Sequence, residues 1–192
     1  MLYQIIYADP PWDYNNWSPI EDEKIARKVG RTNYPTMNLE DICRLPVSTI
    51  ADKDCILFLW ATPPCIEQAF EVIKSWGFFY KTFGFSWVKQ NKQGWGYYSG
   101  LGNWTLGNLE VCLLATHKTF PKRKNPVKQL MLSPLRGHSQ KPDETRERII
   151  QLMGDLPRIE LFSRQKVEGW DSIGFDIDGY DIRESLDKLV TL

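Results

Sequence analysis

The sequence lacks the cysteine and histidine pattern of a zinc site. Its four cysteines lie far apart, none forms a Cys-x-x-Cys pair, and two histidines are present to join them. Zinc sites in proteins use such ligands at short spacings, so we expect no metal ion. Cys55 and Cys112 lie in apolar runs, where a free cysteine behaves as a small hydrophobe, and we expect buried thiols and no disulfides.

The sequence also lacks a hydrophobic run that approaches the roughly 20 residues needed to span a membrane. Met1 leads straight into an apolar segment, without the basic region or small-residue cleavage site of a signal peptide. We therefore expect a cytoplasmic protein that has no membrane partner. With 192 residues and a hydrophobic content of 42%, residues 1–192 are expected to form a single domain with its own core.

The sequence has no net charge, because 24 basic residues balance 24 acidic ones. The charges are unevenly spread, and the stretch from His117 to Lys141 contains seven basic residues and no acidic one. Such a stretch suits the phosphates of a nucleic acid, and its candidate contacts are Lys122, Arg123 and Lys124. A solvated basic loop without a partner explains the stretch equally well.

Apolar runs of strand length alternate with amphipathic segments of helical period. The nearly unbroken runs imply strands that are buried on both faces, which predicts an α/β fold around a mainly parallel sheet. We expect long functional loops at residues 13–35 and 90–108. The expected strands are residues 3–8, 54–60, 78–89, 109–116 and 158–162, and the expected helices begin near residue 39 and cover about 66–76, 143–153 and 181–189.

The motif Asp9-Pro10-Pro11-Trp12 directly follows the first expected strand. Ligands of α/β sheets bind at the carboxyl ends of strands. An aromatic amine is a poor nucleophile because its lone pair is delocalised into the ring. A carboxylate from Asp9 and the backbone carbonyl of Pro10 would accept its two hydrogens and localise that lone pair. The rigid Pro11 supports this geometry, and Trp12 offers a face for an extruded base. The plainer interpretation is that two prolines end a strand.

The motif and several further segments resemble the MT-A family of amino-methyltransferases, which includes the catalytic messenger-RNA adenosine methyltransferase subunit and its bacterial and phage relatives. The resemblance implies a Rossmann-like class I S-adenosylmethionine-dependent methyltransferase fold, permuted so that the catalytic strand precedes the cofactor segment. It also implies methylation of the exocyclic amino group of adenine in a nucleic acid. The matching segments are residues 7–12, 57–60, 85–89, 110–114, 139–144, 159–164 and 169–170.

The resemblance carries cofactor-binding roles to particular residues. Lys141 would suit the methionine carboxylate or the ribose of S-adenosylmethionine, while Phe162 and Arg164 match positions at its adenosine end. The match weakens after Arg164, although Asp176 is placed to accept from ribose hydroxyls. For Glu160 a structural role is equally open. The full expected cofactor set is Asp9, Ser139, Lys141, Glu160, Phe162, Arg164 and Asp176.

The segment 100–105 looks superficially like a dinucleotide-binding fingerprint, but it lacks the third glycine and a following helix pattern. By resemblance it is the loop beside the substrate entrance, with Asn103 and Trp104 exposed to the nucleic acid. The alternative is that Trp104 packs the loop.

The substrate polymer stays open between DNA and RNA. The compact length resembles bacterial and phage DNA-modifying relatives, so DNA is favoured. A non-catalytic nucleic-acid-binding subunit is a different class of function, and the intact motif at residues 9–12 argues against it. Methylation of a protein or a free base is a third hypothesis, for which a related motif with asparagine and tyrosine would be typical. A homodimer or a related partner subunit is compatible with the resemblance.

Overall fold

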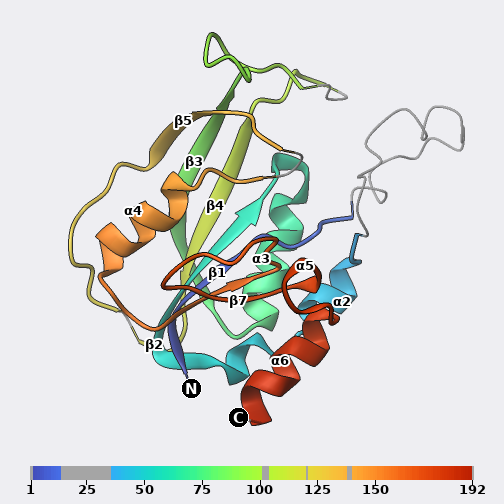
Figure 1. The fold of residues 1–192 in the computed structure, drawn as a ribbon, viewed down its shortest axis with the longest axis vertical. Coiled ribbons are helices and arrows are strands. Elements are labelled where there is room, and N and C mark those ends of the chain that lie inside the picture. The colour runs from blue at the N-terminus through green and yellow to red at the C-terminus, as the bar shows by residue number, and fades with distance from the viewer. Residues whose placement is uncertain (1, 14–35, 101–103, 120, 138–139, 192) are drawn as a thin grey trace, which may run out of the picture.

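A mixed seven-stranded sheet forms the centre of the molecule in this computed structural model, which describes residues 2–13, 36–100, 104–119, 121–137 and 140–191 (Figure 1). The strands lie in the order β5-β3-β4-β2-β1-β6-β7. Their bounds are β1 (Tyr3–Ala8), β2 (Ala51–Ala61), β3 (Phe79–Gln90), β4 (Leu109–Thr116), β5 (Leu130–Pro134), β6 (Arg158–Leu161) and β7 (Asp171–Ile173). The α-helices are α2 (Leu39–Cys43), α3 (Ile66–Ser75), α4 (Glu144–Met153), α5 (Phe175–Asp178) and α6 (Ile182–Thr191), and single 3₁₀ turns cover Val47–Thr49 and Pro63–Cys65.

Strand directions follow from the connections. β1 is parallel to β2 and β6, β6 is parallel to β7, and β3 is parallel to β5. β4 is antiparallel to both β2 and β3. No helix separates β3 from β4 in the described part of that connection, and a strand that returns without a helical crossover pairs antiparallel. The expectation of a mainly parallel sheet is therefore confirmed except at β4.

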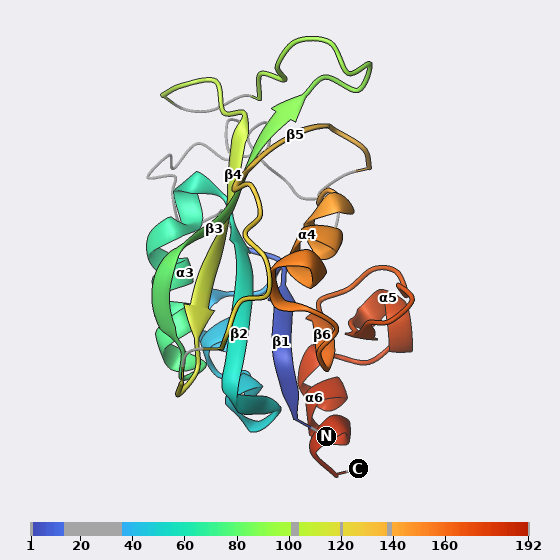
Figure 2. The same cartoon turned by 90° about the vertical axis from the view of Figure 1, so that its left-hand side faces the viewer.

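The central strands of the sheet are buried on both faces, whereas much of β3 and β5 is exposed. Along β2, Leu57 and Leu59 pack with α3 in one core, while Phe58 and Trp60 pack in a second core that includes Ile149 of α4. This alternation reflects the two-residue side-chain period of a strand. Figure 2 shows α3 and α4 on opposite sides of the sheet.

The expected elements are present with shifts of a few residues at their ends. Three short elements were not expected, namely β5, β7 and α5. The expected loop at residues 13–35 falls almost wholly outside the described residues. Among the helices that are described, none has the length and apolar character needed to cross a bilayer.

The order of the strands reverses at β1, which marks the carboxyl ends of β1 and β6 as the position of the ligand-binding crevice of open α/β sheets. From β1 the chain passes to β2 on one side, and it later returns to β6 on the other side of β1. Ligands of open α/β sheets bind at such a reversal of strand order. The residues that follow β1 and β6 therefore face a candidate binding site.

Candidate active site

The motif crosses the carboxyl edge of the sheet immediately after β1. The carbonyl of Pro10 accepts a hydrogen bond from the Trp12 backbone N–H at 2.9 Å, and the carbonyl of Pro11 accepts one from Met37 at 2.9 Å. A carbonyl oxygen has two lone pairs, so Pro10 retains acceptor capacity. The motif is thus fixed at both of its prolines.

Trp12 does not present a face to solvent. Its side chain is 3% exposed and belongs to the core, and its Nε1 donates to the carbonyl of Trp60 at 3.0 Å. The sequence-based expectation of a stacking face therefore does not describe this conformation, because the indole ring is already packed. In the structure Trp12 anchors the motif to β2.

A row of alternating charges begins at Asp9. Lys141 Nζ lies 2.6 Å from Asp9 Oδ2 and 3.2 Å from Glu110 Oε2, and Lys89 Nζ lies 2.5 Å from Glu110 Oε1. The Lys141 side chain is 8% exposed and lies over the Trp60 ring, 5.6 Å from its centroid. The row joins the ends of β1, β3 and β4 to the segment before α4, and its two carboxylates balance its two ammonium groups.

Burial and pairing shift the pKa values of this row in different directions. Burial raises the pKa of the Asp9 carboxyl, and the ammonium of Lys141 opposes that rise without reversing it. Burial also opposes ionisation of Glu110, but Lys141 and Lys89 together hold its pKa below the ordinary value. Burial disfavours the charged form of Lys141, yet Asp9 and Glu110 outweigh it and raise the lysine pKa. Asp9 is therefore the more basic of the two carboxylates.

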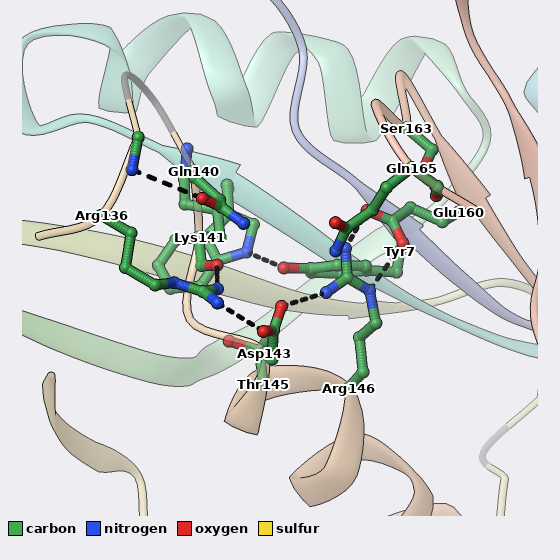
Figure 3. A network of polar contacts seen from close by, with 12 residues as sticks. Tyr7, Arg136, Gln140, Lys141, Asp143, Thr145, Arg146, Glu160, Ser163 and Gln165 are labelled. Atoms are coloured by element: carbon green, nitrogen blue, oxygen red, sulfur yellow. Dashed lines mark hydrogen bonds and ion pairs between the residues drawn. The ribbon is translucent and has the colours of Figure 1, made fainter. Parts of the chain in front are cut away.

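A second network, buried at Arg146 and Glu160 and exposed at Arg136 and Asp143, holds the segment that carries Lys141. Arg146 binds Glu160 through two hydrogen bonds of 2.7 Å and Asp143 through one of 3.1 Å. Arg136 lies 2.5 Å from the other oxygen of Asp143 and donates to the Lys141 carbonyl at 2.8 Å. Figure 3 shows Arg146 reaching between Glu160 and Asp143. Both oxygens of Glu160 are occupied by Arg146, which favours the structural role for this residue.

The backbone beyond β6 has an unusual conformation. Phe162 has a φ of 60°, which few residues other than glycine adopt. The next residue, Ser163, donates its N–H to the carbonyl of Ile173 at 3.0 Å. A Cβ added to Gly174 would lie 2.5 Å from the backbone oxygen of Ser163. The segments that follow β6 and β7 therefore lie so close together that only glycine fits at position 174. This approach brings Phe162 and Arg164 near the turn that leads to Asp176.

The structure gathers most of the expected residues at one edge of the sheet. Asp9, Lys141, Phe162 and Arg164 follow or face the carboxyl ends of β1 and β6, and the charge of Arg164 acts on the Asp9 carboxyl. Asp176 lies in the first turn of α5, just after β7. Ser139 and Asn103 lie outside the described residues.

The expected nucleic-acid contacts occupy two different places. Trp104 is 98% exposed in the connection between β3 and β4, so it does not pack that loop. The basic residues Lys122, Arg123 and Lys124 lie elsewhere, because the Lys124 N–H donates to the carbonyl of Leu152 near the C-terminal end of α4. Lys141 precedes the N-terminal end of that ten-residue helix, and a helix of this length measures about 15 Å.

Three residues of the site were not expected from the sequence. Glu110 and Lys89 complete the charged row, and Arg146 holds Glu160. The sequence contained a clue to the role of Glu110, since this residue is an acid at the start of the apolar run 109–116. Arg146 had one as well, because it lies three residues before the core residue Ile149 and hence on the buried side of α4. Among the described residues, no three histidine, cysteine or acidic side chains are grouped to hold a metal ion.

Comparison with known proteins places the whole described site within one family. A family model described as MT-A70 matches residues 3–176. The chain is 35% identical over 188 residues to the type II methyltransferase M.MunI of Mycoplasma sp, covering 91% of this chain and 78% of that protein. It is 29% identical over 182 residues to the N(6)-adenosine-methyltransferase catalytic subunit METTL3 of Homo sapiens, covering 92% of this chain and 28% of that one. An MT-A70-like N(6)-adenosine-methyltransferase of Arabidopsis thaliana is 27% identical over 180 residues, covering 92% of this chain and 24% of its own length.

Proposed function

The chain belongs to the MT-A70 family, and from that membership we propose that it is an enzyme that transfers a methyl group from S-adenosylmethionine to the exocyclic amino group of adenine in DNA. DNA is favoured because the chain spans most of a type II methyltransferase but about a quarter of the adenosine methyltransferases of Homo sapiens and Arabidopsis. The same reaction on RNA is the alternative. The observation that carries the proposal is the position of Asp9, which follows β1 at the crevice with its carboxylate held by Lys141.

Asp9 and Pro10 are the proposed acceptors for the two amino hydrogens of adenine. Lys141 binds Oδ2 of Asp9, and we assign Oδ1 to the amino group. The remaining lone pair of the Pro10 carbonyl takes the second hydrogen. Two fixed acceptors favour a tetrahedral nitrogen, whose lone pair then points away from the ring and toward the methyl donor. The raised pKa of Asp9 suits this role, because a more basic carboxylate is a stronger acceptor for the proton that nitrogen loses after transfer.

The residues around the crevice fit S-adenosylmethionine. Lys141 and Arg164 supply positive charge for a carboxylate, and Asp176 supplies an acceptor for ribose hydroxyls. The half-buried ring of Phe162 at positive φ offers an apolar surface. When bound, the cofactor supplies an electrophilic methyl group. Ser139 remains a proposed contact. Glu160 is proposed to position Arg146 and the segment before α4 rather than to touch the cofactor.

The order of the elements supports a permuted class I methyltransferase fold. The strand that carries the proposed catalytic motif, β1, comes first in the chain, whereas β6 and β7, which precede the proposed cofactor residues Phe162, Arg164 and Asp176, come last. We propose that residues 1–192 form one such domain, with Pro11 and Trp12 fixing the motif that Asp9 and Pro10 use.

The proposal is tested by product analysis. The protein is incubated with isotope-labelled S-adenosylmethionine and, separately, with DNA, RNA or a mixed peptide library. The polymers are then digested and analysed by mass spectrometry. Labelled N6-methyldeoxyadenosine is the expected product. Label in N6-methyladenosine alone would move the substrate to RNA, and label confined to peptides would refute the proposal.

A further inference from the structure

The charges of the chain are segregated between two parts of its sequence. Residues 72–142 contain eleven of the 24 basic residues and one of the 24 acidic residues, so this segment carries a formal charge of +10 and the rest of the chain carries −10. The single acid of the segment is Glu110, which is 7% exposed and paired with Lys89 and Lys141. The zero net charge therefore conceals a strong electrical asymmetry.

The fold keeps the two charges apart in space. The basic segment begins within α3 and contains β3, β4 and β5, three neighbouring strands that end at β5 on one edge of the sheet. The acidic remainder contains β6, β7, α5 and α6, which lie toward the other edge (Figures 1 and 2). The exposed basic residues of the segment are Lys74, Lys81, Lys92, Lys118, Lys122, Arg123, Lys124, Lys128 and Arg136.

These basic residues are found at both ends of the strands. Lys92 and Arg136 follow β3 and β5, at the end where Glu110 and Lys141 meet Asp9. Lys118 follows β4 at the opposite end, and Lys128 precedes β5, whose first residue pairs with Ser86 part way along β3. Acids from outside the segment border this group. Asp143 pairs with Arg136, Asp52 and Asp54 flank Lys53, whose carbonyl accepts from the Lys118 N–H, and Asp155 follows Gly154, which lies against the Lys124 side chain. The Lys122–Arg123–Lys124 triplet thus extends a basic path that starts beside the candidate active site.

We propose that a nucleic-acid duplex lies along the β3–β5 edge of the sheet, with its target adenine at Asp9 and its flanking phosphates running toward residues 118–128. This inference rests on the proposed function and adds the surface and the direction of binding. β4 has eight residues, and a strand of this length spans about 27 Å, which sets the distance to Lys118; the triplet lies at the C-terminal end of α4, about 15 Å from Lys141. A duplex rises about 3.4 Å per base pair, so the triplet meets phosphates about four base pairs from the adenine and Lys118 meets phosphates about eight base pairs from it.

A second copy of the chain is the competing occupant, because the acidic remainder of the chain is complementary to the basic segment. Two copies can satisfy such a contact twice in a two-fold dimer, or repeat it in a ring or filament, and light scattering of the wild-type protein detects each of these. A duplex is favoured by the position of the path. Its phosphates match a path that is basic at both ends and begins at the site where the target base must enter.

The test compares two triple variants that each remove three positive charges. The first, Lys122→Gln/Arg123→Gln/Lys124→Gln, removes the basic triplet of the proposed path. The matched control, Arg44→Gln/Arg183→Gln/Lys188→Gln, acts on exposed residues at the C-cap of α2 and in α6. Binding of a random-sequence DNA duplex of about 30 base pairs, which covers the path several times over, is measured by fluorescence anisotropy at a series of salt concentrations.

In the first variant the slope of log affinity against log salt should be smaller in magnitude by about 2.7. The reason is that each of the three lost phosphate contacts on duplex DNA contributes about 0.9. The control should keep the wild-type slope, and both variants should keep the wild-type affinity for S-adenosylmethionine. An unchanged slope in the first variant, or an equal change in the control, would overturn the inference. The inference would also be overturned if light scattering showed that the first variant loses self-association while the slope of its DNA affinity against salt is unaltered.

These outcomes are separable from the proposed function. If the wild-type protein methylates DNA but the slopes of the two variants do not differ, the duplex path is wrong and the enzymatic assignment stands. A further variant, Lys118→Gln/Lys128→Gln, tests the path at two positions outside the triplet and should reduce the magnitude of the slope by about 1.8.

Discussion

Asp9→Asn is expected to lower kcat for adenine methylation by about 10²–10³-fold, because the loss of one preorganised acceptor costs on the order of 2.7–4 kcal/mol in the barrier. Asparagine keeps the size of the side chain and one oxygen, but it removes the charge 2.6 Å from Lys141. Removing one partner of a fully buried ion pair costs about 3–5 kcal/mol of stability. The cost here should be smaller, since the Asp9 side chain is 25% exposed and Lys141 keeps Glu110 at 3.2 Å.

Glu110→Gln provides the matched control, because it removes a carboxylate of the same charge from the same lysine. Its effect on the melting temperature should be similar to or larger than that of Asp9→Asn, since Glu110 is more buried and also pairs with Lys89. Its effect on kcat should be clearly smaller. Single-turnover methyl transfer gives the rate, calorimetry gives the cofactor affinity, and thermal unfolding gives the stability. Equal losses of kcat in the two variants would refute a direct role for Asp9, as would near wild-type turnover in Asp9→Asn.

The pH dependence of the same reaction offers an independent check. Asp9 accepts hydrogens as a carboxylate, so kcat falls as the pH drops through its pKa. Because burial raises that pKa, the acid limb should lie above the range of an exposed aspartate. In Lys141→Met the opposing ammonium is absent, and the limb should move to still higher pH when measured at saturating cofactor. A limb that stays in place would contradict the pairing of these two residues in the active protein.

Three further predictions concern the surroundings of Asp9. Lys141→Ala and Arg164→Ala should each weaken S-adenosylmethionine binding in titration calorimetry, and unchanged affinity in both would remove them from the cofactor site. Arg146→Met should destabilise the protein by about 3–5 kcal/mol in urea unfolding, because it leaves the carboxylate of Glu160 buried without its partner; a loss under 1 kcal/mol would show that the pair is solvated. Trp104→Ala should weaken nucleic-acid binding by about 1–3 kcal/mol if a base stacks on this ring, while the melting temperature stays unchanged because the side chain is 98% exposed.

Long, strongly patterned elements were predictable from the sequence. The run 3–8 coincides with β1, and the periodic segments near residues 66 and 143 became α3 and α4. β7 and α5 have three and four residues, and segments so short contain little more than one repeat of a strand or helical pattern. β4 was predicted as a strand, but its antiparallel direction depends on its connection to β3 and not on its composition.

The site residues that belong to a sequence motif could be predicted. The residues that reach the site only through the three-dimensional fold could not. Asp9 and Lys141 were expected near each other through the resemblance, and they form an ion pair. Glu110 joins them from β4, a contact that no local pattern encodes. The basic triplet was expected to contact nucleic acid, but its distance from Asp9 follows from the direction of α4, which the sequence does not reveal.

The packing of Trp12 has a practical consequence for mutational scanning of this motif. Replacing a buried tryptophan by alanine typically costs about 3–5 kcal/mol, and here the Trp60 carbonyl would also lose its donor. An inactive Trp12→Ala protein would therefore say little about recognition of a base, because the lost packing of Trp12 would already disturb the position of Asp9. Phenylalanine at this position keeps an aromatic ring in the core and removes the indole N–H. Comparing the two substitutions would separate the contribution of Trp12 to packing from any direct contribution to methyl transfer.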